Sequence, residues 1–387
     1  MTLAINQERP GFSLLERVLH INWAFVLLVC CPACIGFLML YSAAGGSIDP
    51  WAKSQMVRFG VGFCLMLIVA LIDLRFWMRA AYWCYGLAFI MLVAVELLGA
   101  TAMGAQRWVA IGPIQLQPSE LMKIALILAL ARYFHGISFE DIGRIRVFVL
   151  PLLLIFLPVA LVLRQPDLGT AILLVLGGAS VLFLAGMRLW KLGLAAAGVI
   201  GAVPVAWQFL RDYQKTRVLT FLDPGSDPLG AGYHILQSKI ALGSGGVFGK
   251  GFMQGSQAHL NFLPEKQTDF IFTMLAEELG LVGALGTLVL YLAIIAFGMI
   301  IALRSHNQFG RLLALGVVVT FFLYVFVNVG MVMGLMPVVG VPLPLISYGG
   351  SAMLTLLAGF GFVLNVWIHR DLRIGRRPGS PPPRGPA

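Results

Sequence analysis

The sequence predicts an all-α polytopic membrane protein with about ten transmembrane helices, both termini in the cytoplasm and one large external loop. Three observations support this fold class. Of the 387 residues, 59% are hydrophobic and only 11% are charged. An average soluble domain has about 25% charged residues. The mean hydropathy is +0.90, and apolar runs of about 20 residues, long enough to cross a bilayer, recur along the chain. This composition excludes an ordinary soluble enzyme, a disordered chain and a fibrous repeat.

Ten apolar segments are predicted to span the membrane. They cover residues 22–43, 54–72, 80–98, 119–135, 146–163, 168–186, 191–209, 279–303, 312–334 and 351–369. The first run lacks a small-residue cleavage site in the expected position, so we expect it to be retained. Residues 1–370 are expected to form one transmembrane domain. Residues 371–387 are basic and proline-rich and are expected to form a disordered cytoplasmic tail.

Lysine and arginine are distributed unequally over the short loops, which predicts the orientation of the chain. One side of the membrane, with the N-terminus and the C-terminal tail, carries most of them. The opposite short loops hold only Lys53, Arg58, Arg107 and Arg164. Both termini are therefore expected in the cytoplasm. Because the basic residues are spread over many loops, the net charge of +10 does not indicate a nucleic-acid partner.

Residues 210–268 interrupt the pattern of short loops. Loops beyond about 15 residues without structure of their own are uncommon and often functional. This segment is rich in glycine, carries both signs of charge and contains short amphipathic stretches such as residues 233–242. We expect a large external loop with short helices. Within it, residues 243–251 resemble a phosphate-binding loop, but the spacing fails and Gly251 stands where Ser or Thr is required.

The first candidate site lies at the start of the fourth predicted span. Pro118 and Ser119 suit a helix start, so Glu120 and Lys123 would be i, i+3 neighbours on one face. Lys123 would lie about 6 Å into the helix. Ionisable groups in apolar spans are costly and are functional candidates for that reason. The pair could hold an anionic head group, or it could be a structural ion pair.

Three further candidates lie on external segments. Asp167 stands in a tight turn before the sixth span, where it could bind a ligand or only cap the helix. Asp269 stands where the long polar loop re-enters an apolar segment, and a partly desolvated carboxylate there could act as a general base or could be a capping group. Residues 342–351, including Ser347, could form irregular backbone at membrane depth or a plain turn.

Five strings in the expected order together resemble the SEDS family of shape, elongation, division and sporulation proteins. They are GAQRWVAIGPIQLQPSELMK (104–123), RQPDLGTA (164–171), DPLGAGYHILQSKIALGSGGVFGKG (227–251), NFLPEKQTDFIFTMLAEELGLVG (261–283) and PLPLISYGGS (342–351). The resemblance extends from the first span to residue 370. Residues 217–246 and 334–351 are more similar to the elongation branch of the family than to its division branch.

The resemblance implies a peptidoglycan glycosyltransferase of cell elongation. Such proteins polymerise lipid II, a disaccharide-peptide on undecaprenyl pyrophosphate, into β-1,4 glycan strands at the outer face of the bacterial inner membrane. The active site would therefore face the periplasm. The family's essential loop aspartate matches Asp269, and its other site residues match Arg107, Asp167, Glu120 and Lys123. In this interpretation Glu120 holds and orients Lys123, and Ser347 belongs to the substrate-binding residues.

The implied reaction converts an α linkage at the donor into a β linkage, so it inverts the anomeric carbon. Inversion needs one general base on the acceptor hydroxyl and cations on the leaving diphosphate. We assign Asp269 to the base and Lys123 with Arg107 to the pyrophosphate, with Lys250 or Arg217 as further candidates. A divalent cation, Mg²⁺ or Mn²⁺, could share the leaving-group task, although the sequence shows no clear ligand set.

The resemblance also implies partners. No Ser-x-x-Lys acyl-transfer motif is evident in a soluble domain of the chain, so a class B penicillin-binding protein would crosslink the strands. Its transmembrane helix would pack on the lipid-facing spans, together with other membrane proteins of the elongation complex. Three alternatives stay open: a division-type polymerase, a pure scaffold and a lipid II flippase. A transporter is expected to place ionisable residues near the bilayer midplane, often on broken helices.

Overall fold

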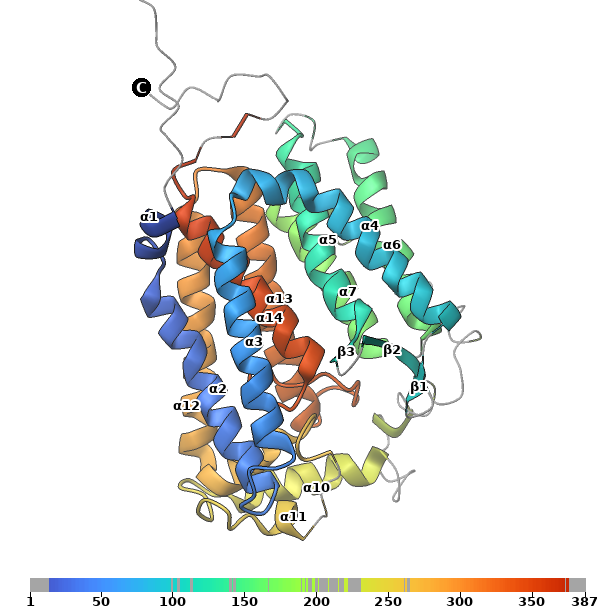
Figure 1. Ribbon diagram of the computed structural model, residues 1–387. Coiled ribbons are helices and arrows are strands. Elements are labelled where there is room, and N and C mark those ends of the chain that lie inside the picture. The colour runs from blue at the N-terminus through green and yellow to red at the C-terminus, as the bar shows by residue number, and fades with distance from the viewer. Residues whose placement is uncertain are drawn as a thin grey trace, which may run out of the picture.

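The structure is a computed structural model, mostly helical, and Figure 1 shows it as a ribbon. It describes residues 14–98, 100–102, 105–111, 114–138, 144–165, 167–188, 231–260 and 265–372, and a few others (141, 190–191, 193, 197–198, 201, 208, 215, 219–221, 262, 374 and 375). The predicted seventh span, 191–209, and the tail from residue 376 lie almost entirely outside the described residues. These two predictions, and the single domain over residues 1–370, stay predictions.

The other predicted spans each coincide with a helix. These are α2 (Trp23–Ala43), α3 (Trp51–Leu71), α4 (Leu74–Leu98), α5 (Pro118–His135), α6 (Val149–Arg164), α7 (Leu168–Leu184), α12 (Ile271–Leu303), α13 (Gln308–Val332) and α14 (Gly350–Ile368). Short helices are α1 (Leu14–Leu19), η2 (Ile145–Phe148), α10 (Ala231–Ser244) and α11 (Ser256–His259). Within the described residues, seven helices are long and apolar enough to cross a membrane. The chain is an integral membrane protein.

The two ends of the helix bundle differ. The turn between α12 and α13 lies at one end, and α10 and α11 lie at the other, which we call the loop end (Figure 1). The predicted amphipathic stretch 233–242 is confirmed as a helix, because it lies within α10. A small antiparallel sheet that the sequence did not predict precedes α5. Its order is β1 (Ala100–Ala102), β2 (Ala105–Ile111) and β3 (Ile114–Leu116).

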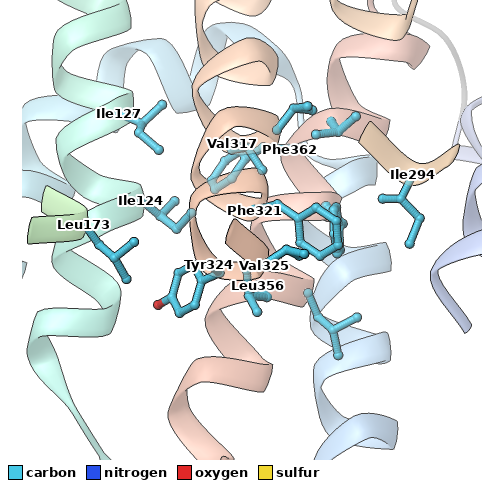
Figure 2. Close-up of a cluster of buried hydrophobic side chains, with 14 of the residues drawn as sticks. Ile124, Ile127, Leu173, Ile294, Val317, Phe321, Tyr324, Val325, Leu356 and Phe362 are labelled. Carbon is cyan, nitrogen blue, oxygen red and sulfur yellow. The ribbon is translucent and has the colours of Figure 1, made fainter. Parts of the chain in front are cut away.

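Helices α13 and α14 form the centre of the bundle. Their apolar windows are 72% and 78% buried, against 22% for α4. Figure 2 shows Phe321 and Tyr324 of α13 in the buried cluster, with Ile124 of α5 and Leu356 of α14. Small residues allow membrane helices to approach closely. A Cβ at Gly361 of α14 would lie 2.6 Å from the carbonyl oxygen of Met66 on α3. The site described below is built on this central pair.

Helix α12 is broken at Gly280, whose φ of 69° and ψ of −167° are not helical. The segment 246–251 replaces the hydrogen bonds lost at the break. The amides of Lys250 and Gly251 donate to the carbonyls of Glu277 and Glu278, at 3.0 and 3.1 Å. The amide of Leu281 donates to the carbonyl of Gly246 at 2.9 Å. The glycine-rich segment is therefore the partner of a helix break, and it requires glycine where the two backbones touch.

The break divides α12 into a short half-helix, residues 271–279, and a spanning part, residues 281–303. At 1.5 Å per residue the spanning part is about 34 Å long, enough for the hydrocarbon core of about 30 Å. The predicted span 279–303 therefore agrees with the part of α12 that follows the break. The half-helix extends the helix further toward the loop end, and eight of its nine residues are buried, Ile271 to Glu278.

Candidate active site

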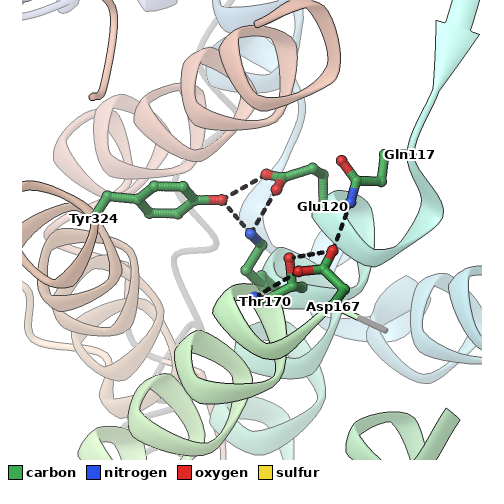
Figure 3. A network of polar contacts seen from close by, with 6 residues as sticks. Gln117, Glu120, Asp167, Thr170 and Tyr324 are labelled. Atoms are coloured by element: carbon green, nitrogen blue, oxygen red, sulfur yellow. Dashed lines mark hydrogen bonds and ion pairs between the residues drawn. The ribbon is translucent and has the colours of Figure 1, made fainter. Parts of the chain in front are cut away.

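A buried cluster of polar groups joins α5 to α13. The ammonium group of Lys123 forms an ion pair with Glu120 Oε1 at 2.7 Å, and both side chains are almost fully buried. The hydroxyl of Tyr324 donates to Glu120 Oε2 at 2.6 Å, and it also accepts a hydrogen bond from Lys123. The predicted i, i+3 pair is thus confirmed. Tyr324, which lies about 200 residues further along the chain, binds both members of the pair (Figure 3).

Asp167 lies beside this cluster as the N-cap of α7. Its Oδ1 accepts from the amide of Thr170 at 3.1 Å, so the capping interpretation is confirmed. Its Oδ2 accepts from the hydroxyl of Thr170 at 2.9 Å and from the side-chain amide of Gln117 at 3.0 Å. Gln117 directly precedes α5 and stands three residues before Glu120. Its contact with Asp167 therefore joins the start of α7 to the start of α5, which carries the Glu120–Lys123 pair (Figure 3).

Asp269 is held near the same face of α13. The side-chain amide of Asn328 donates to the backbone carbonyl of Asp269 at 3.0 Å and to that of Val341 at 2.7 Å. Asn328 follows Tyr324 by four residues, so the two side chains lie on one helix face about 6 Å apart along the axis. Helix α13 therefore presents the Glu120–Lys123 pair and the Asp269 backbone side by side, at its loop end.

Residues 339–341 connect Asp269 to the start of α7. A Cβ at Gly169 would lie 2.6 Å from the carbonyl oxygen of Val339. A Cβ at Gly340 would lie 3.6 Å from Asp269 Oδ2. The motifs around residues 120, 167 and 269 are thus neighbours in space although they are far apart in the sequence.

Ser347 fixes the loop that carries Asp269. Its hydroxyl donates to the carbonyl of Thr268 at 2.6 Å and accepts from the amide of Leu343 at 2.7 Å. The amide of Tyr348 donates to the carbonyl of Gln267 at 2.8 Å. The segment 342–351 is therefore irregular backbone packed against protein, as one of the two interpretations predicted. The buried hydroxyl of Ser347 is engaged within the protein and positions the residue before Asp269.

Lys250 lies at the break in α12. Its ammonium group contacts Glu277 Oε1 at 2.7 Å and the hydroxyl of Ser256 at 2.8 Å, and 29% of its side chain is exposed. Arg107 lies on β2, but its side chain is outside the described residues, and Arg217 is outside them altogether. Lys266, three residues before Asp269, is partly buried, and this desolvation lowers the pKa of its ammonium group below the ordinary value.

The described residues contain no group of three or more His, Cys, Asp and Glu side chains arranged to hold a metal ion. Mg²⁺ and Mn²⁺ take several oxygen ligands. We therefore assign no step of the chemistry to a divalent cation. The described site offers a buried cation, Lys123, which Glu120 and Tyr324 hold. It also offers the carboxylate of Asp269, on a loop that Asn328 and Ser347 hold.

The sequence did not point to Tyr324 and Asn328. Gln117 and Thr170 lie within the strings that it singled out, but they received no role of their own. Tyr324 and Asn328 lie within an apolar run, and Asn328 is the one polar side chain among residues 321–334 apart from the hydroxyl of Tyr324. A buried amide in a spanning segment needs partners. This rule could have identified Asn328 as a candidate from the sequence. It could not have identified the groups that Asn328 binds.

The fold and the site define a multi-pass integral membrane protein with a polar site at the loop end of its helices. The chain belongs to the FtsW/RodA/SpoVE family, because the family model of these cell cycle proteins matches residues 22–372. The peptidoglycan glycosyltransferase MrdB of Escherichia coli (strain K12) is 46% identical over 370 residues, which cover 94% of this chain and 98% of that protein. A probable peptidoglycan glycosyltransferase FtsW of Geobacter metallireducens is 34% identical, over 91% of this chain and 96% of that protein.

Solved structures agree with this assignment. A chain from a structure titled "Structural coordination of polymerization and crosslinking by a peptidoglycan synthase complex" matches with a TM-score of 0.78 and 35% identity. It covers 90% of this chain and 98% of its own length. The rod shape determining protein RodA of Thermus thermophilus matches with a TM-score of 0.69 and 32% identity, over 90% of this chain and 97% of its own. The family resemblance seen in the sequence is confirmed.

Proposed function

We propose that this chain is a peptidoglycan glycosyltransferase that polymerises lipid II into β-1,4 glycan strands during cell elongation. The identity to MrdB over almost the full length of both chains supports the activity. The observation that carries the proposed site is the convergence on one face of α13. Tyr324 holds a buried Glu120–Lys123 pair, and Asn328, one turn away, holds the loop of Asp269.

Each side chain then has a distinct task. Asp269 takes the proton of the acceptor hydroxyl as general base. Lys123 stabilises the charge that develops on the leaving pyrophosphate, since a cation fixed in a site shielded from water acts strongly. Glu120 and Tyr324 fix the position of Lys123 through direct contacts. Arg107, Arg217 and Lys250 are further candidates for contacts with the pyrophosphate, and Asp167 for a contact with the substrate.

The alternative of a lipid transporter gains one supporting feature, the broken helix α12. Transporters place such breaks at the bilayer midplane. Here residues 281–303 are long enough to span by themselves, so the break lies toward the loop end. Glu277 beside the break is paired with Lys250. The position of the break therefore favours a structural role, and polymerisation remains the proposal.

The proposed partner is a penicillin-binding protein that crosslinks the strands. The synthase complex whose chain matches this fold is titled for coordinated polymerization and crosslinking, which supports such a partner. We propose that its transmembrane helix packs on lipid-facing spans and that other membrane proteins of the elongation complex associate with them. The membrane is proposed to be the bacterial inner membrane, with the loop end in the periplasm.

The experiment is polymerisation of labelled lipid II by purified protein in liposomes, with and without the partner. Wild type should give glycan ladders, and Asp269→Asn should abolish them while it still binds lipid II. Glu265→Gln is a matched control, because Glu265 is an exposed carboxylate in the same loop. It should leave the ladders unchanged. Ladders of normal intensity from Asp269→Asn would refute the assignment of the base. Translocation of fluorescent lipid II without ladders would favour the transporter.

A further inference from the structure

Arg58 is a cation inside the spanning helix α3, and the proposed mechanism does not use it. It follows the first residue of α3, Trp51, by seven positions, so it lies about 10 Å into the helix from the loop end. The side chain is half-buried. Arginine in a membrane span is costly and as a rule has a function. A long side chain at this depth can extend its charged group toward the head-group region of the bilayer.

The guanidinium group of Arg58 has a favourable contact with an aromatic ring, but no anion faces it among the described residues. Its Cζ is 4.5 Å from the ring centroid of Tyr348, a cation–π contact. A Cβ at Gly350 would lie 3.2 Å from its Nε, so the group lies against the first turn of α14. A helix N-terminus carries a partial positive charge, which repels a cation. Nη1 has no contact with solvent and no hydrogen-bond partner within the part of the chain that is described.

Gln55, on the same face of α3, holds the neighbouring loop through hydrogen bonds of its own. Gln55 precedes Arg58 by three residues. Its side-chain amide donates to the carbonyl of Ser347 at 2.8 Å, and its Oε1 accepts from the amide of Gly349 at 3.4 Å. Lys123 and Lys250, two other cations of the proposed site, each contact a carboxylate. No ion pair joins Arg58 to a carboxylate among the described residues.

We propose that Arg58 binds the phosphate of a lipid at the loop end of α3. An anion would neutralise the guanidinium, accept its hydrogen bonds and face the positive end of α14. The planar guanidinium matches phosphate oxygens in a bidentate manner. The phosphate comes either from an isoprenoid pyrophosphate or from a phospholipid head group.

The site is connected to the loop of the proposed general base. Tyr348, which the guanidinium covers, donates its amide to Gln267, two residues before Asp269. Polymerisation joins two lipid-linked sugars, so two lipid phosphates must come near one base. Lys123 serves one of them, and Arg58 is placed to bind the other. This part of the inference rests on the proposed function, whereas lipid binding by Arg58 does not.

The test is native mass spectrometry of the full chain from phosphatidylcholine nanodiscs that contain either undecaprenyl pyrophosphate or phosphatidylglycerol. Hydrogen bonds to charged groups predict that Arg58→Gln weakens retention of the bound lipid by about tenfold or more. Arg58→Lys, which keeps the charge but not the planar fork, should be intermediate. Lys53→Gln is the matched control, since Lys53 is an exposed cation of the same helix, 3.6 Å from Asp49. It should change retention by less than about twofold.

The two lipids separate the sources of the phosphate. Loss of undecaprenyl pyrophosphate in Arg58→Gln, with a raised KM for lipid II, would support a substrate site. Loss of phosphatidylglycerol alone, with KM unchanged, would support a head-group site. Retention of both lipids at the wild-type level would overturn the proposal. If Arg58→Gln does not fold, Arg58→Lys carries the same comparison. Failure of the wild type to polymerise lipid II would contradict the proposed function but not the retention result.

Discussion

Lys123 and Glu120 form an almost fully buried ion pair, and neither charge is stable there without the other. Each would be a buried charge without a counterion if the other were removed, and breaking such a pair costs about 3–5 kcal/mol. Tyr324 adds a hydrogen bond to each member. Removal of one charge is therefore expected to lower both the polymerisation activity and the stability of the protein, and an experiment has to separate the two effects.

A double-mutant cycle separates these effects. We expect Lys123→Met to destabilise the protein by about 3–5 kcal/mol, because it leaves Glu120 uncompensated. The pair of changes Lys123→Met and Glu120→Gln should recover a large part of that stability but no polymerisation. Unfolding in mixed micelles and the liposome ladder assay measure the two quantities. If the double variant is less stable than Lys123→Met, the pair does not stabilise through charge compensation.

Ser347 gives a second prediction at the scale of single residues. Its hydroxyl contacts Thr268 and Leu343, so Ser347→Ala leaves a partly buried carbonyl and a buried amide without this partner. We expect a loss of about 1–3 kcal/mol of stability. In polymerisation kinetics, kcat should fall while KM changes little, because the Asp269 loop loses its position. A raised KM with unchanged kcat would instead favour direct contact between Ser347 and the substrate. Ser347→Thr, which keeps the hydroxyl, should restore part of kcat.

At the scale of elements, the broken helix α12 determines where Asp269 lies. The half-helix 271–279 begins directly after Phe270, so its position sets that of the Asp269 loop. The segment 246–251 holds the half-helix through backbone hydrogen bonds on both sides of Gly280. Lys250 reinforces this arrangement through Glu277.

Gly280→Ala should be strongly destabilising. Gly280 has a φ of 69°, and a Cβ there would overlap the backbone amide of Gly249 and lie 2.5 Å from the carbonyl oxygen of Val247. We expect polymerisation to be lost together with stability. Gly286→Ala is the matched control in the same helix, because a Cβ at Gly286 meets nothing within 4 Å. Alanine is about 1 kcal/mol more favourable than glycine in a helix, so this variant should be at least as stable as wild type in thermal unfolding. Equal stability of the two variants would refute the role of the break.

At the scale of the whole molecule, the distribution of lysine and arginine predicts which end of the bundle faces the cytoplasm. The test is labelling of single cysteines with a membrane-impermeant maleimide in a background without the native cysteines. Gln254→Cys at the loop end should react in intact spheroplasts. His306→Cys, in the turn between α12 and α13, should react only after permeabilisation. The opposite pattern would invert the topology and place the proposed site in the cytoplasm.

The sequence predicted those features that depend on neighbours along the chain. Helical periodicity placed Glu120 and Lys123 on one face of α5, and their ion pair is confirmed because the helix itself brings i and i+3 together. The same holds for Asp167 as the cap of α7. The apolar runs located the spans, because a helix must satisfy its own backbone within lipid.

Contacts between distant segments were decided by the tertiary structure alone. Lys123 and Tyr324 are 201 residues apart, and Asp269 and Asn328 are 59 residues apart. Whether such residues meet depends on which helices pack together, and no local pattern encodes that choice. The break in α12 is a further case, since Gly280 can leave helical geometry only because residues 246–251 supply the missing hydrogen bonds. The sequence by itself determined the nine spans that coincide with described helices, the ion pair and the family, and the packing around α13 decided how these parts form one site.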